Sequence, residues 1–486
     1  MPPAYLKLMK NSTILLFFLA LLPGFLTAQT VATDAAMYKL NLPNYTEYQN
    51  VRINGVFRNT GTDTLKSVVV NWTVNGGPVQ RLGFDTLKVA RNQNWPFFSS
   101  GDLVLDADGD WIIKAWVSSP NGKTDEKASN DTLTHTIQVV KAYPAKNILI
   151  EEVTGAWCGF CPRAPIIYKK SVAPVYPNTI FVAIHTGDGM AIADSRDFTN
   201  TYVTGVPCGF VDRRKMPDGT KIDFSPEEWL NTLNHTENRF NPAILNVYNY
   251  YDPATSEGKI DVVADFIFNM SADFRLNAYI VEDSLIGSGS NWDQRNFFNG
   301  GANDPYRELQ GAGDPLPGYY HNHVVRKMLG GSFGQAGIIP SQIKRGDRYV
   351  FSKTFKADSK WKMNQVHIVG LLQLYNSDKL GRQIINSVKT GVSLKTGTGP
   401  AENPSSVTLY PNPAGETAWL QIQGFRPGKM EVKIYSISGQ EMVTKTLENN
   451  AADQKTPLDL SACTPGVYFV QISDGEKLQT IKLIRQ

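Results

Sequence analysis

Two cysteines separated by two residues, Cys158 and Cys161 in the segment WCGFC, are the side chains of this sequence best suited to chemistry. A short apolar run precedes them and a helical pattern follows, so we predict the pair at a strand-to-helix junction. At the N-terminus of a helix, free backbone N–H groups and the helix dipole favour a thiolate. The second thiol, one turn deeper, can resolve a mixed disulfide. The spacing therefore predicts a dithiol able to exchange with other disulfides, with Trp157 as a shield beside the sulfur of Cys158.

Other cysteines do not turn this pair into a metal site. A CxxC pair is also half of a zinc site, but no second pair exists, because Cys208 and Cys463 are isolated in the sequence. His321 and His323 alternate on a predicted strand and would share a face, yet no third ligand is evident beside them. We therefore predict neither a metal site nor a cofactor.

His185 and Asp188 end a predicted strand in the segment VAIHTGDG. In parallel sheets, the carboxyl ends of strands share an edge with the helix N-termini that carry active sites, so both residues could border Cys158. His185 could then act as a base or thiolate partner, or it could be a hydrogen-bonded loop histidine.

The elements around the cysteines alternate between strand and helix. Strands are predicted in AKNILIEEV, TIFVAIH and GVPCGFVDRR, and a helix in SPEEWLNTLNHTENR, which indicates a small α/β domain over residues 144–240. With WCGFC after the first strand, this order resembles the thioredoxin-like superfamily. The resemblance implies that Pro207 is a cis-proline facing the dithiol and that Glu152 is a buried acid assisting proton transfer. Because Glu151 is adjacent and points the opposite way, we expect only one of the two carboxylates to face inward.

The sequence also departs from thioredoxins proper. Gly-Phe stands between the cysteines where Gly-Pro is usual, and this dipeptide tunes redox potential, so the direction of reaction does not carry over. Cys208 directly follows Pro207. It is either a third thiol near Cys158 or a small buried residue on the far face of its strand.

The remaining chain is predicted to form β-rich modules. Alternating apolar and polar residues indicate an immunoglobulin-like β-sandwich over 29–143 and a second β-sandwich over 241–395, the latter with an irregular surface loop at about 286–320. A linker over 396–404 leads to a small C-terminal β-sandwich, 405–486. The predicted fold class is thus multidomain and mainly β, with one α/β unit.

The N-terminus indicates export. Residues 1–28 resemble a secretory signal peptide, with Lys7 and Lys10 before an apolar stretch from Ile14 to Leu22. No other segment could cross a membrane as a helix, so we predict no transmembrane span in the mature form. A net charge of +3 gives no electrostatic case for a nucleic-acid partner.

Motifs near the C-terminus point to the same destination. LYPNPA, VKIYSISGQ, GVYFVQI and the basic end IKLIR resemble the type A sorting domain of Bacteroidota type IX secretion. That family implies passage across the outer membrane by the type IX machinery, removal of the domain, and release or attachment at the cell surface. Within that group, residues 147–390 resemble the outer membrane protein twenty-eight family.

Four tripeptides resemble the short O-glycosylation signal of Bacteroidota. They are three copies of Asp-Thr-Leu and one of Asp-Ser-Leu. Their acceptors would be Thr64, Thr86, Thr132 and Ser284.

Three functions stay open at this point. The first is thiol–disulfide exchange with a protein disulfide or thiol substrate, by attack of Cys158, resolution by Cys161 and support of the substrate backbone by Pro207. The second is a non-catalytic surface binder or adhesin with a permanent disulfide, covered perhaps by residues 286–320, while the sandwiches contact a surface ligand. The third is a thiol sensor or metal carrier that adds Cys208, which stays unpaired if Cys463 is removed with the tail.

Overall fold

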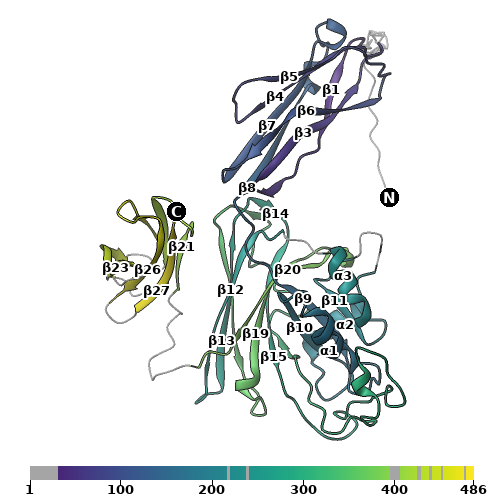
Figure 1. Ribbon diagram of the computed structural model, residues 1–486, viewed down its shortest axis with the longest axis vertical. Coiled ribbons are helices and arrows are strands. Elements are labelled where there is room, and N and C mark those ends of the chain that lie inside the picture. The colour runs from purple at the N-terminus through teal and green to yellow at the C-terminus, as the bar shows by residue number, and fades with distance from the viewer. Residues whose placement is uncertain are drawn as a thin grey trace, which may run out of the picture. The chain divides into compact units, whose positions relative to one another are not determined.

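The computed structural model describes residues 31–215, 219, 221–236, 240–394, 406–423, 428–436, 440–449, 453–474 and 478–486. The predicted signal peptide and linker lie outside the described residues. Strands predominate, and the chain divides into two compact units between Tyr143 and Pro144. Each unit is described by itself (Figure 1).

The first unit is a sandwich of two sheets. One sheet has the order β1-β3-β6 and the other β2-β8-β7-β4-β5. Alternate side chains of β4 and β7, such as Trp72 and Ile113, turn inward onto a shared apolar core with Phe57 and Phe97, as strand periodicity requires. The strands are β1 (Ala35–Leu40), β2 (Tyr45–Glu47), β3 (Gln49–Asn59), β4 (Val68–Val74), β5 (Gln80–Phe84), β6 (Asn94–Leu105), β7 (Gly109–Ser118) and β8 (Thr132–Val140), with short 3₁₀ turns η1 (Pro120–Gly122) and η2 (Ala128–Asn130). The two-sheet sandwich is present, and its immunoglobulin-like topology stays a prediction.

A seven-stranded mixed sheet organises the second unit. Its order is β11-β9-β10-β16-β15-β19-β20. Strands β9, β10 and β16 are parallel, and the others pair antiparallel. The strands are β9 (Ile148–Thr154), β10 (Thr179–His185), β11 (Cys208–Val211), β15 (Phe274–Glu282), β16 (Val324–Met328), β19 (Val366–Leu374) and β20 (Gln383–Gly391).

Both faces of this sheet are covered. On one face, Ile150 of β9 packs in one apolar cluster with Ala164 of α1 (Arg163–Ile167) and Trp229 of α3 (Trp229–Thr236). On the other face, Val153 packs in a cluster with Phe198 of α2 (Arg196–Tyr202). Figure 1 shows the three helices beside β9, β10 and β11. Because β9 is buried from both sides, all seven of its residues are buried.

A smaller sheet packs against the far end of the seven-stranded one. It has the order β12-β13-β18, and its side chains share a core with Leu276 and Ile280 of β15 and Ile368 of β19. Its strands are β12 (Ala243–Asp252), β13 (Glu257–Phe266) and β18 (Arg348–Lys356), and β14 (Met270–Ser271) pairs with β17 (Gln342–Ile343). Short helical turns are η3 (Tyr168–Val172), η4 (Ala193–Ser195), η5 (Pro226–Glu228), η6 (Arg307–Leu309), η7 (Met363–Gln365) and η8 (Lys379–Gly381).

The predicted domain boundary at residue 240 does not separate two sheets. Strands β15, β16, β19 and β20, which we assigned to a separate β-sandwich, continue the sheet of β9, β10 and β11. The reason is that β16 pairs in parallel with β10, a long-range contact that local alternation of residues does not encode.

The C-terminal part consists of two further antiparallel sheets around their own apolar core. Cys463 is buried in this core and is not in a disulfide. The strands are β21 (Ser406–Tyr410), β22 (Thr417–Gln423), β23 (Gly428–Ser436), β24 (Glu441–Asn449), β25 (Asp453–Asp459), β26 (Gly466–Ser473) and β27 (Leu478–Arg485).

Candidate functional site at the Cys158–Cys161 disulfide

Cys158 and Cys161 form a disulfide, with their Cα atoms 5.4 Å apart. They lie between the end of β9 and the start of α1, in tight turns closed by hydrogen bonds from the Cys158 N–H to Gly155 O and from the Cys161 N–H to Cys158 O. Our prediction placed Cys158 at a helix N-terminus, but α1 begins only at Arg163 and is five residues long. The dithiol therefore precedes the helix, and the helix dipole cannot carry the argument for a reactive thiolate.

The segment 286–320 covers the cysteine turn. Its backbone pairs with the turn, since the Arg295 N–H donates to Ala156 O at 2.8 Å and the Phe297 N–H donates to Gly159 O at 2.9 Å. The Gln294 side chain also donates to Cys158 O at 2.9 Å. Cys158 is 5% exposed and Cys161 1%. The sulfurs are thus close to the surface of the fold but shielded.

Aromatic residues complete this cover. Phe160, between the two cysteines, contacts Phe297 edge to face with ring centroids 5.2 Å apart, and Phe298 at 5.7 Å. Trp157 stands on the other side of Cys158, half exposed, and its indole N–H donates to Thr186 O at 2.8 Å. Both flanking aromatic residues therefore leave an apolar surface around the disulfide.

The covering segment is irregular and mostly exposed, as we predicted, with η6 as its only helix or strand, but internal bonds hold it in place. The Asn296 side-chain amide donates to Leu309 O and Gly313 O, and Arg295 forms a two-pronged ion pair with Asp314 at 2.8 Å. Asn296 is buried and acts as a hub for the segment. The Gly, Asn and Asp content that suggested irregularity supplies these turns and side-chain bonds.

Glu152 lies on the face of the sheet that α1 covers, the same face as Ile150 two residues earlier. It is buried, and its Oε1 atom has no hydrogen-bond partner among the described residues. Burial raises the pKa of Glu152 to about 8, against the lowering effects of Thr154 and Arg163. At neutral pH this carboxyl group is therefore mostly protonated, which a solvent-facing strand end would not be.

Glu151 is also buried, on the opposite face, so the expectation that only one of the two residues faces inward is wrong. Arg213 donates to its two carboxylate oxygens at 2.6 and 2.7 Å, and the Tyr279 hydroxyl donates at 3.0 Å. Arg213 and Tyr279 come from outside the helices that cover Glu152. The sequence could not show this because both faces of β9 are covered by distant parts of the chain.

Pro207 immediately precedes β11 and Cys208 is its first residue, and β11 pairs antiparallel with β9. The Val206–Pro207 peptide bond is cis. Cys208 is a free thiol that packs in the apolar cluster on the α2 face, opposite Val153, whereas Glu152 lies on the α1 face. Burial raises the pKa of the Cys208 thiol to about 12, with smaller contributions from Asp223 and Glu152. Cys208 is thus a neutral buried thiol, which suits packing better than exchange.

His185 and Asp188 are connected to the cysteine turn. His185 Nδ1 lies 2.6 Å from Asp188 Oδ2, which also accepts the Ala156 N–H at 2.8 Å, two residues before Cys158. Burial alone would raise the pKa of Asp188, but hydrogen bonds with His185, Ala156 and Met190 lower it. His185 therefore positions the turn through Asp188, and its ring also packs against His321 at 5.3 Å.

The predicted strand does not include His321 or His323, because β16 begins at Val324, and the two imidazoles have different partners. His321 Nε2 lies 2.9 Å from Trp292 O, whereas His323 has a left-handed backbone (φ 59°) and its Nδ1 lies 3.2 Å from Asp283 Oδ1. Asp283 also faces His367 of β19, at 3.5 Å from its Nδ1. Sequence reasoning missed Asp283 and His367 because they lie about forty residues from His323 on either side, and only the sheet brings them together.

Three of the four glycosylation candidates lie in the first unit. Thr64, Thr86 and Thr132 are exposed, while Ser284 is half buried. Modification at these positions stays a prediction.

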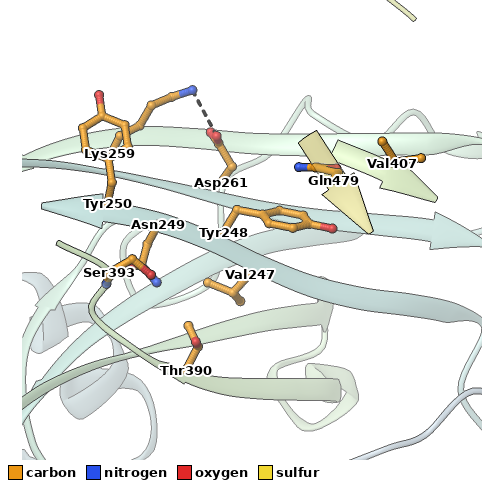
Figure 2. A pocket seen from close by; sticks show the side chains of 10 residues that line it. All are labelled: Val247, Tyr248, Asn249, Tyr250, Lys259, Asp261, Thr390, Ser393, Val407 and Gln479. Atoms are coloured by element: carbon orange, nitrogen blue, oxygen red, sulfur yellow. Dashed lines mark hydrogen bonds and ion pairs between the residues drawn. The ribbon is translucent and has the colours of Figure 1, made fainter. Parts of the chain in front are cut away.

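Two hollows lie away from the cysteines. One of about 550 Å³ is lined by residues 189–194 and by Arg326, Lys327, Lys356, Ala357, Asp358 and Trp361. The other, of about 370 Å³, lies beside β12, and Figure 2 shows Tyr248 and Asn249 there with the Lys259–Asp261 ion pair (3.0 Å) of β13. Neither hollow is lined by Cys158, Cys161 or Glu152.

Comparisons with known proteins add family matches to this geometry. The family model of outer membrane protein Omp28 matches residues 196–395, and that of the secretion system C-terminal sorting domain matches residues 408–486. The resemblance of the C-terminal part to a sorting domain is thereby confirmed, and the resemblance to Omp28, which we expected over 147–390, is confirmed from residue 196 onward. The Omp28 match begins after the cysteine turn.

Several solved structures are similar to parts of the chain. HBP35 of Porphyromonas gingivalis has 19% identity and a TM-score of 0.40, covering 71% of this chain and 99% of its own. Protein AGR_C_4864 from Agrobacterium tumefaciens has 14% identity and a TM-score of 0.31, covering 53% and 100%. Dimeric latent PorU from Porphyromonas gingivalis has 11% identity and a TM-score of 0.24, covering 94% and 34%. The search among curated proteins gave no match.

The family matches establish where the protein goes. With a sorting tail and an outer membrane protein family match, it is secreted or displayed at the cell surface, and the tail implies the type IX secretion machinery as a partner. Among the described residues, no helix combines the length and the apolar character needed to span a bilayer.

Proposed function

We propose that this surface protein is a thioredoxin-like thiol–disulfide exchange protein that acts through Cys158 and Cys161 on protein thiols or disulfides. The observation that carries the proposal is Glu152, a buried carboxyl group with an unpartnered oxygen on the sheet face that α1 covers. A permanent disulfide has no need of such a group, because leaving a buried polar atom unpaired destabilises the fold by about 1–3 kcal/mol. A resolving thiol does need one, because it must gain and lose a proton in each cycle.

The exchange step follows from the oxidised state. A substrate thiolate attacks the Cys158 sulfur, a mixed disulfide forms, and the Cys158–Cys161 bond breaks with its electron pair going to the Cys161 sulfur. Glu152, protonated near neutral pH, supplies the proton for that sulfur. A second thiolate of the substrate then attacks the substrate sulfur that is bonded to Cys158, and Cys158 leaves as a thiolate. The substrate loses two electrons, which the cysteine pair gains, and the reverse sequence reduces a substrate disulfide.

Pro207 and Trp157 have supporting roles in this proposal. Pro207 precedes β11 and holds the backbone of the substrate beside Cys158, and the exposed face of Trp157 contacts its side chains. Because Cys158 is only 5% exposed, attack requires the Gln294–Phe297 part of the cover to shift away from the turn. His185 and Asp188 keep the turn in place while the cover moves.

A thiol-trapping titration tests the proposal. The full chain is equilibrated across a dithiothreitol series, quenched with an alkylating reagent and analysed by mass, while exchange is followed on a disulfide-bonded protein substrate. We expect reduction of the pair in the folded protein, loss of exchange in Cys158→Ser, and unchanged exchange in the control Cys208→Ser. Exchange that survives in Cys158→Ser, or sulfurs that react only after unfolding, would overturn the proposal.

The covering segment favours a second candidate, in which the disulfide is a structural staple of a non-catalytic surface protein. Backbone pairing of residues 295 and 297 with the cysteine turn is the observation behind it. This candidate predicts a pair that stays oxidised until the protein unfolds, together with a loss of stability in Cys158→Ser of about 2 kcal/mol, because the disulfide closes a short loop. The same titration therefore separates the two functions.

A further inference from the structure

Asp283, His323 and His367 form a cluster of three metal-ligating side chains away from the cysteine pair. Asp283 follows β15, His323 precedes β16 and His367 is the second residue of β19. One ligand atom from each residue lies within 4.8 Å of the others. These adjacent strands of the central sheet therefore bring together two imidazoles and one carboxylate.

The spacing within the cluster suits a single ion. Zinc binds imidazole nitrogen and carboxylate oxygen at about 2.0–2.2 Å, so two ligands at a tetrahedral angle stand about 3.4 Å apart. In the structure, Asp283 Oδ1 and Oδ2 lie 3.2 and 3.5 Å from the Nδ1 atoms of His323 and His367. Only small movements would bring all three groups into a common coordination sphere.

Contacts with neighbouring residues hold the side chains of His323 and His367 in place without a bound ion. The His323 N–H donates to Asp283 Oδ1 at 2.6 Å, and the His323 ring packs edge to face against Phe181 at 5.5 Å and near Tyr168 at 6.5 Å. His323 Nδ1, which lies 3.2 Å from Asp283 Oδ1, is buried and has no hydrogen-bond partner among the described residues, and His367 is 6% exposed. A buried imidazole nitrogen left unsatisfied beside a carboxylate is costly unless something else occupies the site.

We propose that Asp283, His323 and His367 bind one divalent transition-metal ion of the zinc class. Imidazole ligands favour such ions over Ca²⁺ or Mg²⁺, which take oxygen ligands. The side chains of Asp283 and His323 are 26% and 30% exposed, so one side of the cluster is open and a water molecule can complete four-coordination.

The site also has a structural consequence. Asp283 and His323 bracket the segment 286–320 that covers the disulfide. An ion bound between them closes the base of that segment and ties both ends to β19 through His367. Metal binding itself does not depend on the proposed exchange function, so the two can fail separately.

The test measures metal binding to the full chain with the disulfide kept oxidised, so that the thiols of Cys158 and Cys161 cannot take part. Zn²⁺ is titrated by calorimetry, and Co²⁺ by the visible absorption that a four-coordinate nitrogen and oxygen site gives. We expect one equivalent, with affinity lowered in His323→Ala, His367→Gln and Asp283→Asn by more than the about 10–100-fold that loss of an outer-sphere partner causes. His235→Ala, which removes an exposed histidine of α3, should bind like the parent protein.

Folding does not confuse the outcome, because His323 lies outside the strands and is partly exposed, and circular dichroism checks each variant. Absence of saturable Zn²⁺ binding in the parent protein would overturn the proposal. So would binding of equal affinity in folded His323→Ala and the parent, which would place the ion elsewhere.

Discussion

Two neighbouring carboxylates on β9, Glu151 and Glu152, occupy opposite environments on the two faces of the central sheet. Glu151 is fully paired, with Arg213 at 2.6 and 2.7 Å and the Tyr279 hydroxyl at 3.0 Å. Glu152 is equally buried but has an oxygen with no partner, and burial raises its pKa to about 8. One face therefore holds a satisfied ion pair and the other an unsatisfied acid.

The difference between Glu151 and Glu152 indicates different roles for the two carboxyl groups. A buried charge that is completely paired fixes the packing of its surroundings, and it has no capacity left to react. A buried carboxyl group without a full set of partners destabilises the fold, and this is why we propose proton transfer as the use of Glu152. The disulfide lies between β9 and α1, and α1 covers the face that holds Glu152.

We expect the largest effect on stability from removing the ion pair between Glu151 and Arg213. Arg213→Met leaves the Glu151 carboxylate buried without its partner, and it should lower the free energy of unfolding by about 3–5 kcal/mol. Equilibrium unfolding in urea measures this. The control is Arg307→Ala, which removes an exposed pair with Asp304 and should change stability by about 0–1 kcal/mol. Equal losses in the two variants would remove the distinction between a buried and an exposed pair.

The buried carboxyl group of Glu152 should make the stability of the protein depend on pH. The pKa of Glu152 in the folded protein, about 8, lies above its ordinary value of 4.5, so the folded state keeps a proton that the unfolded state releases. The contribution of the Glu152 proton to stability is complete below the pKa of the unfolded state, and it is lost as pH rises through the pKa of the folded state. Compared with Glu152→Gln, the parent protein should lose about 1.4 kcal/mol of stability per pH unit between about pH 5 and 8.

Urea unfolding of both proteins across this range gives the difference directly, because other titrating groups cancel. If the plots of stability against pH are parallel for the parent and Glu152→Gln, the carboxyl group of Glu152 titrates normally. The contrast drawn between Glu151 and Glu152 would then be wrong.

Local sequence patterns were enough to locate the cysteine turn and the strands beside it. Alternation and apolar runs mark β9 and β10, and the CxxC spacing marks the dithiol. The same patterns could not distinguish Glu151 from Glu152, because a period of two assigns them to opposite faces without saying what covers each face. Arg213 and Tyr279, which pair with Glu151, are brought to β9 by tertiary structure.

The sequence suggested residues 286–320 as a cover for the disulfide, but the contacts of this cover and the metal cluster could not be predicted from it, for the same reason. The segment 286–320 showed only turn-forming residues, and its bonds to residues 156 and 159 join positions more than a hundred residues apart. Likewise, His323 gave no sign of Asp283 and His367, because their proximity depends on the pairing of β15 with β16 and β19. Non-local strand pairing decides both features.

A smaller effect should follow from loosening the cover above the unpaired face. A Cβ atom at Gly159 would lie 2.3 Å from the Phe297 ring, so Gly159→Ala pushes this ring away from the cysteine turn. The side chain of Phe297 is half exposed and can move, so we expect a stability change within about 1 kcal/mol and a several-fold faster reduction of the disulfide by dithiothreitol.

Gly301→Ala is the matched control for this substitution. Gly301 lies in the segment 286–320, as Phe297 does, and a Cβ atom there would contact nothing within 4 Å. Reduction at the parent rate in Gly159→Ala, or the same acceleration in Gly301→Ala, would mean that Phe297 does not limit access to the sulfurs.

We expect the smallest effect on disulfide reduction from metal binding at the base of the segment 286–320. There an ion held by Asp283 and His323 would join the two ends of the segment. Saturating Zn²⁺ should slow reduction of Cys158–Cys161 by a few-fold, because it restricts the openings of the segment that precede attack. The reductant must be a phosphine that binds the ion weakly, and rates are compared with those of His323→Ala under the same conditions. If Zn²⁺ binds to the parent protein but leaves the rate unchanged, the ion site and the disulfide are independent. In that case only the contacts of Gln294, Arg295 and Phe297 with the turn control access to the sulfurs beside the unpaired acid.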